Sequence, residues 1–196
     1  MAILLPAGPE MAVAFVTCAV VAAAAPLDPA APGPDLARSL AALGARALLV
    51  GADGAAAARH AAADLGVPLL TSVGPIGLES GGIVGRVAST ADAASPRLPR
   101  PEDVAMVLQS SGTTGRPKLI PLTHHHVCTT AFHMTGALRL TPADRLLAMM
   151  PMFHVQALVG ELLATLTAGA SIVRTAGFDL PRFFDWLAAY DPTWYS

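Results

Sequence analysis

The stretch "VAMVLQSSGTTGRPKLIPLTH", residues 104–124, decides how this chain is interpreted, because it places a polar insert between two apolar segments. The run "VAMVLQ" is typical of a buried strand, and a second apolar piece, "LIPLTH", follows the insert directly. Gly112 and Gly115 allow backbone conformations that other residues avoid, and they let a ligand approach the main chain closely. The pattern predicts a strand that leads into a ligand-binding loop.

The chemistry of this loop favours a polyphosphate. Successive backbone N–H groups in such a loop can converge on an anion, and hydroxyl groups add further donors. Lys118 is the only lysine in the chain, and its ammonium group is a mobile positive charge suited to phosphate. We therefore predict a phosphate-binding set of Ser110, Ser111, Gly112, Thr113, Thr114, Gly115 and Lys118.

Two common loop chemistries do not match this spacing. The P-loop requires G-x-x-x-x-G-K-[ST], whereas Arg116 and Pro117 separate Gly115 from Lys118, and Leu119 follows the lysine. A Ser-x-x-Lys acyl-enzyme motif would need serine at the position of Gly115. The spacing thus weakens a phosphotransferase with an unusual nucleotide loop, and the remaining alternative is a flexible Gly/Ser/Thr turn without a ligand.

The segments around this loop predict an α/β fold, with repeated βα units around a largely parallel sheet, because short apolar runs alternate with longer alanine-rich segments. We expect strands at 2–5, 47–50, 68–71, 105–109, 146–150 and 171–174. Helices are expected at 9–24, 35–43, 55–65, 125–138, 155–168 and 180–189.

The ends of these helices and the domain boundaries also leave signals. Gly44, Gly66 and Gly169 stand where helix C-termini favour glycine, and Asp35 and Asp179 are candidate helix N-terminal anchors. The proline-rich segment 89–101 predicts a linker or surface loop between two subdomains, residues 1–88 and 102–196. We expect the first subdomain to be incomplete at its N-terminus and the second at its C-terminus.

Composition narrows the partners. With 54% hydrophobic residues and a net charge of −2, the chain is expected to be globular and to lack the basic field that attracts nucleic acid or an anionic membrane. The apolar run at 11–25 lacks a preceding positive charge and is shorter than the ~20 residues of a membrane helix, so we expect no membrane span. Cys18 and Cys128 are expected to be buried, unpaired thiols in a cytoplasmic protein.

The loop residues "SSGTTGRPK" resemble the phosphate-binding signature of the adenylate-forming superfamily of acyl-CoA synthetases, luciferases and peptide-synthetase adenylation domains. The resemblance extends along the chain in order, through "AILLPAGPEMAVAF" with "AAAAPLDP", then "MMPMFHVQALVGELLATLTAGASIV", and then "FDWLAAYDPTWYS". The details look closest to acyl-CoA or oxalate–CoA ligases. The resemblance identifies the chain as part of the large N-terminal domain of such an AMP-binding enzyme.

The resemblance implies a two-step ligase reaction with ATP, Mg²⁺ and coenzyme A. A carboxylic acid would attack the α-phosphate of ATP to give an acyl-adenylate and pyrophosphate, and a thiol would then take the acyl group. His154 would be the catalytic residue that orients or gates the acid, and residues 110–118 would hold the β- and γ-phosphates. The alternative for His154 is a half-buried histidine at the start of a helix, with its hydrogen bonds satisfied.

A run of histidines, His124 to His126, raises the question of zinc, since His124 and Cys128 would share a helix face. Because the family commonly has a single histidine near this point, the resemblance implies that His124 supports the loop. We expect no metal ligands in this chain.

The resemblance also implies missing parts. The glutamate that binds magnesium, the segments that hold adenine and ribose, and the C-terminal domain with its catalytic lysine have no counterpart in these 196 residues. We therefore expect a truncated ligase that is inactive alone and that self-associates through exposed sheet edges or needs a complementary fragment. The alternative is a non-enzymatic remnant that binds only nucleotide or a partner chain.

Overall fold

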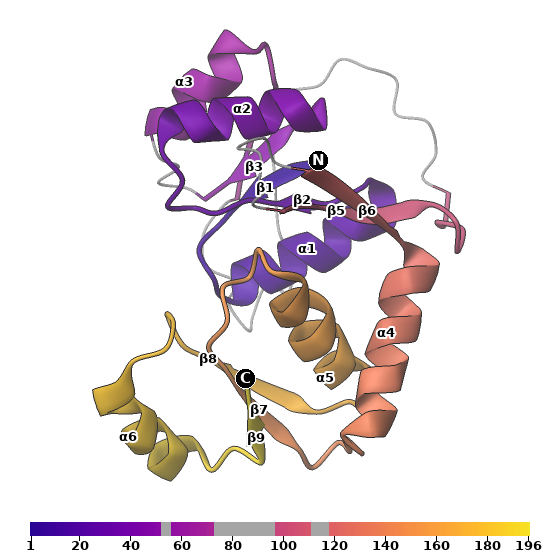
Figure 1. The fold of residues 1–196 in the computed structure, drawn as a ribbon, viewed down its shortest axis with the longest axis vertical. Helices are drawn as coiled ribbons and strands as arrows, with labels where there is room; N and C mark the ends of the chain where they lie inside the picture. The colour runs from indigo at the N-terminus through magenta and orange to yellow at the C-terminus, as the bar shows by residue number, and fades with distance from the viewer. Residues whose placement is uncertain (52–55, 73–96, 111–117) are drawn as a thin grey trace. The chain divides into compact units, whose positions relative to one another are not determined.

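The computed structural model describes residues 1–51, 56–72, 97–110 and 118–196 (Figure 1). These residues form two compact units, Met1–His124 and His125–Ser196. The linker predicted at 89–101 lies largely outside the described residues. The predicted subdomain boundaries therefore stay a prediction.

Unit 1 is built on a parallel sheet. Within the described residues its order is β2-β1-β3-β4, and every neighbouring pair is parallel. The elements are β1 (Ala2–Leu4), α1 (Pro9–Val21), β2 (Ala25–Pro26), α2 (Gly33–Leu43), β3 (Leu48–Val50), α3 (Ala56–Asp64) and β4 (Leu69–Thr71). This alternation confirms the predicted βα units.

Helices cover both faces of this sheet, which explains why β1 and β3 are buried at every position. Leu4 and Leu48 pack with Leu36 and Leu40 of α2 and with small alanines of α3 in one apolar core. Helix α1 buries Met11, Ala14, Phe15 and Cys18, a spacing of three and four residues that gives a helix one apolar face. Figure 1 shows α1 on the opposite side of the sheet from α2 and α3.

An antiparallel hairpin completes unit 1. Strands β5 (Val104–Ser110) and β6 (Lys118–Thr123) pair antiparallel. The Met106 region of β5 runs parallel to Ala24, with hydrogen bonds of 2.9 Å from Ala24 N–H to Ala105 O and 2.8 Å from Val107 N–H to Ala24 O. The first segment of the quoted stretch is thus a strand, as predicted, whereas β2 and the strand character of β6 were not predicted.

Unit 2 contains a second parallel sheet, whose order within the described residues is β8-β7-β9. Its elements are α4 (His124–Ala137), which begins at the last residue of unit 1, β7 (Arg145–Ala148), the π-helix η1 (Gln156–Leu163), α5 (Ala164–Thr167), β8 (Ser171–Arg174), α6 (Leu180–Tyr190) and β9 (Trp194–Tyr195). The helix predicted at 155–168 is therefore continuous but wound as a π-helix over most of its length, which the apolar pattern does not distinguish.

Helix ends follow the predicted chemistry at most positions. Gly44, Gly66 and Gly169 have positive φ angles of 56°, 63° and 70°, as expected for residues that end helices in the left-handed conformation. The Asp179 carboxylate accepts a 3.2 Å hydrogen bond from Arg182 N–H and caps α6. The prediction for Asp35 is wrong, because Pro32 occupies the N-cap of α2 and Asp35 lies inside the first turn.

The cysteines behave differently from each other. Both are free thiols, and Cys18 is buried as predicted, where burial raises the pKa of its thiol. Cys128 is exposed, which corrects the expectation that it is buried. Its position on α4 falls outside the helix face that buries Val127 and Ala131. No helix among the described residues is long and apolar enough to cross a bilayer.

Candidate functional site

The two ends of the predicted phosphate loop meet across the hairpin. In the antiparallel register Ser110 pairs with Lys118, and Gln109 pairs with Leu119. The structure therefore brings Ser110 and Lys118 together at the loop end of the hairpin, where β5 connects to β6. The other predicted loop residues, Ser111, Gly112, Thr113, Thr114 and Gly115, lie outside the described residues.

The strand that leads into the loop is fixed in unit 1. Met106 is fully buried, and the backbone bonds to Ala24 hold the middle of β5. Nearer the loop, the Ser39 hydroxyl donates a 2.8 Å hydrogen bond to the Gln109 side-chain oxygen. The Gln109 amide in turn donates to Ser39 O at 3.4 Å. Ser110 is thus the last residue of an anchored strand, which holds one end of the loop in place.

The strand that leaves the loop is more open. Lys118, Leu119 and Ile120 are exposed, so the Lys118 ammonium group faces solvent at the mouth of the hairpin. A hydroxyl donor and a cation side by side fit an anionic oxygen, because each phosphate oxygen accepts several charge-assisted hydrogen bonds. The two described residues of the predicted set, Ser110 and Lys118, thus carry donors of the kind that phosphate oxygens accept, and phosphate binding stays a prediction.

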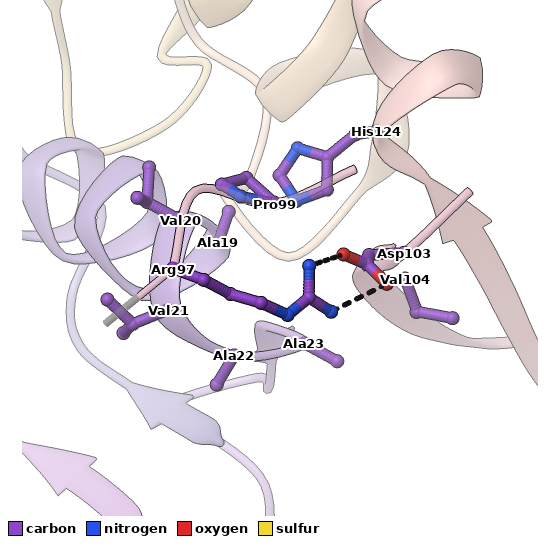
Figure 2. A pocket seen from close by; sticks show the side chains of 10 residues that line it. All are labelled: Ala19, Val20, Val21, Ala22, Ala23, Arg97, Pro99, Asp103, Val104 and His124. Carbon is purple, nitrogen blue, oxygen red and sulfur yellow. Dashed lines mark hydrogen bonds and ion pairs between the residues drawn. The ribbon is translucent and has the colours of Figure 1, made fainter. Parts of the chain in front are cut away.

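A small pocket lies at the opposite end of the hairpin, where β5 begins and β6 ends (Figure 2). Its volume is about 270 Å³, and it lies between the end of α1 and the segment that precedes β5. Arg97 and Asp103 form an ion pair of 2.9 Å at its edge, and the hydrogen bonds from Arg97 and Arg100 lower the pKa of Asp103. This pocket lies at the Val104–Thr123 end of the hairpin, away from Ser110 and Lys118.

His124 lies at this end of the hairpin, away from the loop. Its backbone N–H donates a 3.0 Å hydrogen bond to Asp103 O, which ties the end of β6 to the start of β5. Its side chain lines the pocket, as Figure 2 shows. A role in supporting the loop through the hairpin is in line with this geometry and stays a prediction. Among the described residues, no cluster of three His, Cys, Asp or Glu side chains is arranged to hold a metal ion.

His154 stands at the carboxyl end of β7 in unit 2. Its N–H bonds to Pro151 O at 3.1 Å in a tight turn, and its own carbonyl accepts from Leu158 N–H at 3.2 Å as the helix begins. The imidazole is exposed and leans on the Phe153 ring, with 4.6 Å between ring centroids. A half-buried histidine with satisfied partners is therefore not what the structure shows. The carboxyl ends of parallel strands are where open α/β sheets bind ligands.

A buried charged pair that was not predicted from the sequence lies near this turn. The Glu161 side chain is 1% exposed and the Arg174 side chain 12% exposed, and Arg174 Nη1 lies 3.7 Å from Glu161 Oε2. Burial raises the pKa of Glu161 above its ordinary value, although Ser196 and Arg174 act in the opposite direction. Burial likewise lowers the pKa of Arg174. The signal was available, because one glutamate interrupts the apolar run "LVGELLATL" and one arginine ends the apolar strand "SIVR".

Comparison with known proteins settles the family. The family model described as AMP-binding enzyme matches residues 1–196. The chain belongs to this family. An oxalate–CoA ligase of Arabidopsis thaliana is 33% identical over 181 residues, which cover 89% of this chain and 35% of the relative. An oxalate–CoA ligase of Saccharomyces cerevisiae is 39% identical over 101 residues, which cover 52% of this chain and 19% of the relative.

Solved structures agree on the fold. The ATP-bound MatB from Rhodopseudomonas palustris has a TM-score of 0.77 and 23% identity, with 96% of this chain and 37% of MatB covered. This likeness confirms the α/β fold. The chain spans about a third of the length of these longer relatives.

Proposed function

We propose that this chain carries the ATP phosphate-binding part of an adenylate-forming acid–CoA ligase. The observation that carries the proposal is the pairing of Ser110 with Lys118 at the loop end of an anchored hairpin, in a chain of the AMP-binding enzyme family. Ser110, Ser111, Gly112, Thr113, Thr114, Gly115 and Lys118 would hold the β- and γ-phosphates of ATP.

The proposed reaction has two steps. A carboxylate oxygen attacks the α-phosphorus of ATP, the bond to the β-phosphate oxygen breaks, and pyrophosphate leaves with the electron pair. The thiol of coenzyme A then attacks the acyl carbon and AMP leaves. Negative charge develops on phosphate oxygens in the first step, so hydroxyl, amide and ammonium donors held in place are the main catalytic resource.

Each residue has a defined task in this proposal. Lys118 supplies positive charge to the terminal phosphates, and the Ser110 hydroxyl donates a hydrogen bond beside it. His154 would orient the acid at the carboxyl end of β7. Mg²⁺, when bound with ATP, neutralises phosphate charge, and the described residues supply no cluster of carboxylates to hold it.

The acid is proposed only as a class. The matched relatives are named for different acids, among them oxalate, sulfoacetate and 4-coumarate. We therefore propose a small-molecule carboxylic acid, with ATP and coenzyme A as co-substrates, in the cytoplasm. The two free cysteines support a reducing compartment.

A second candidate function is a polypeptide that binds nucleotide or a partner chain without catalysis. It is favoured by the exposed aromatic side chains around α6 and β9, since Phe178 and Phe184 are each 65% exposed and Tyr195 is 60% exposed. Such a cluster suits an interface with a second copy or a complementary fragment. Sedimentation of the 196-residue chain would reveal self-association, and a monomer at high concentration would oppose it.

Pyrophosphate release separates the two candidates. We expect the 196-residue chain to bind ATP yet to release no pyrophosphate when a carboxylic acid is added. Mixing it with a fragment that supplies the remaining two thirds of a relative should restore release in a manner that depends on Lys118. Release by the isolated chain would refute the expected inactivity, and a complemented mixture that ignores Lys118→Ala would refute the phosphate site.

A further inference from the structure

The two faces of the unit 2 sheet differ in polarity. Leu147, Val173 and Met149 pack with Trp186 of α6 in an apolar cluster on one face. Because strand residues alternate between faces, Leu146, Ala148, Ile172, Arg174 and Trp194 lie on the other face, towards η1. Arg174 is therefore a largely buried charged residue on a sheet face whose other members are mostly apolar.

Glu161 of η1 meets Arg174 on this face. The pair is 3.7 Å apart between Nη1 and Oε2, while the other terminal nitrogen, Nη2, donates to Met150 O in the turn after β7. Ser196 is close enough to lower the pKa of Glu161, but within the described residues no hydrogen bond of ordinary geometry reaches either Glu161 carboxylate oxygen or Arg174 Nε. The guanidinium fork thus connects a π-helix on one side with the turn that carries His154 on the other.

Stability alone is a poor reason for this arrangement. Removing both charges from water is expensive, and at 3.7 Å, with neither carboxylate oxygen and not Arg174 Nε in hydrogen-bond geometry, the pair recovers only part of that cost. Apolar residues of similar volume in such places are often neutral or more stable. The π-helix that presents Glu161 is itself a rare form that occurs frequently at functional sites.

The turn that Arg174 reaches is otherwise fastened by main-chain bonds. Met149 N–H donates to Ser196 O at 3.1 Å, and His154 N–H closes on Pro151 O. The carbonyl of Met150, between these two points, receives the Arg174 side chain. A displacement of Met150 moves the backbone four residues before His154, at the start of the same turn.

We propose that Arg174, held in orientation by Glu161, is a positioning residue that fixes the Met150–His154 turn and so sets the place of the His154 imidazole. The catalytic consequence rests on the proposed ligase function, but the positioning itself does not. Lysine cannot replace arginine here, because a single ammonium group cannot pair with Glu161 and bond Met150 O as two separate nitrogens of a planar fork do.

Histidine NMR tests this inference without any ligand. The 196-residue chain would be labelled with ¹³C-histidine, and the His154 signal, assigned with His154→Asn, would be followed in Arg174→Lys. We expect the His154 ring signals to lose the shift caused by the Phe153 ring and to move towards those of an unfolded histidine. His60 of unit 1 should keep its signals and serves as an internal control.

Two further variants guard against a trivial result. The double variant Glu161→Met/Arg174→Met removes both charges, should fold, and should also release His154. Arg145→Lys is the matched control, because Arg145 also donates to a backbone carbonyl, that of Tyr190, at the other end of β7. It should leave His154 unchanged.

The outcomes are distinct. A His154 shift in both Arg174 variants but not in Arg145→Lys supports the positioning role. Unchanged His154 signals in a folded Arg174→Lys or double variant would overturn it. If Arg174→Lys alone fails to fold, the double variant decides. Failure of ATP binding would contradict the proposed function but would leave this readout intact.

Discussion

The two sheets of this chain are both parallel, but they are buried in different ways. On the α2–α3 side, the sheet of unit 1 is covered by a core whose described members are alanine, leucine and valine. The sheet of unit 2 has an apolar face under α6 and an opposite face that buries a carboxylate and a guanidinium. Unit 1 thus shows apolar packing on this side of its sheet, whereas unit 2 accepts the energetic cost of a buried charged pair that reaches the turn before His154, as functional sites often do.

The largest expected effect is on unit 2. Arg174→Met alone should destabilise it by about 3–5 kcal/mol, because Glu161 stays buried without its cation. Both tryptophans, Trp186 and Trp194, lie in unit 2, so tryptophan fluorescence during urea unfolding reports this unit. Glu161→Met/Arg174→Met should recover most of the loss. A double variant as unstable as the single one would contradict the view that the charges, rather than the packing, are costly.

The next effect probes the apolar support of unit 1. Leu48→Ala removes a fully buried side chain from the core and should cost about 2–5 kcal/mol, as measured by far-UV circular dichroism in urea. Leu48→Met keeps the volume and should cost less than about 1.5 kcal/mol. If both variants lost the same stability, the core of unit 1 would not depend on packing volume as described.

A smaller effect compares one helix start in each unit. Asp179→Ala removes the N-cap of α6 and should cost about 1 kcal/mol. Asp35→Ala removes only an exposed ion pair with Arg38 within the first turn of α2, and should cost about 0.5 kcal/mol or less. Thermal unfolding of the two variants measures the difference, and equal losses would show that Asp35 also caps its helix.

The smallest effect is a difference in pH dependence. Burial raises the folded-state pKa of Glu161 above 4.5, so the folded chain holds this proton to higher pH than the unfolded chain does. The stability that this contributes is present below pH 4.5 and is lost as the pH rises through the folded pKa. Glu161→Gln should remove that loss in a urea-unfolding series across pH.

Partly exposed carboxylates in both units give the opposite sign. Hydrogen bonds lower the pKa of Asp103 in unit 1 and of Asp144 in unit 2 below 3.8, so their contribution is present above that pH and is lost as the pH falls. Because these groups remain in Glu161→Gln, the difference between that variant and the wild type isolates Glu161. An identical pH profile for the two proteins would mean that Glu161 titrates as it does in the unfolded chain.

Much of the fold could be predicted because its signals are local. Apolar runs such as "LLV" at 48–50 and the glycine after α2 mark a strand and a helix end within a few residues. The two-residue strands β2 and β9 could not be found, since they exist only through pairing with distant strands. The same holds for the register that places Lys118 opposite Ser110.

The candidate site was predictable in part for the same reason. The loop chemistry lies in adjacent residues, so Ser110 and Lys118 could be named from sequence. Their pairing in the hairpin is observed, and their role towards a ligand stays a prediction. The Glu161–Arg174 contact depends on a π-helix and on the sheet face of β8, and no local pattern specifies these. Cys128 was misjudged because an apolar helix pattern does not say which side faces solvent.

Calorimetric titration of the chain with ATP and with AMP tests whether the loop between β5 and β6 binds the terminal phosphates of ATP. We expect ATP to bind more tightly than AMP, and Lys118→Ala to weaken ATP binding by about 10-fold or more, the loss expected for a hydrogen bond to a charged group. Arg100→Ala removes a cation that precedes the start of β5, at the end of the hairpin away from the loop, and should leave ATP affinity unchanged. Equal ATP affinity in the wild type and Lys118→Ala would show that Lys118 does not hold the phosphates of ATP.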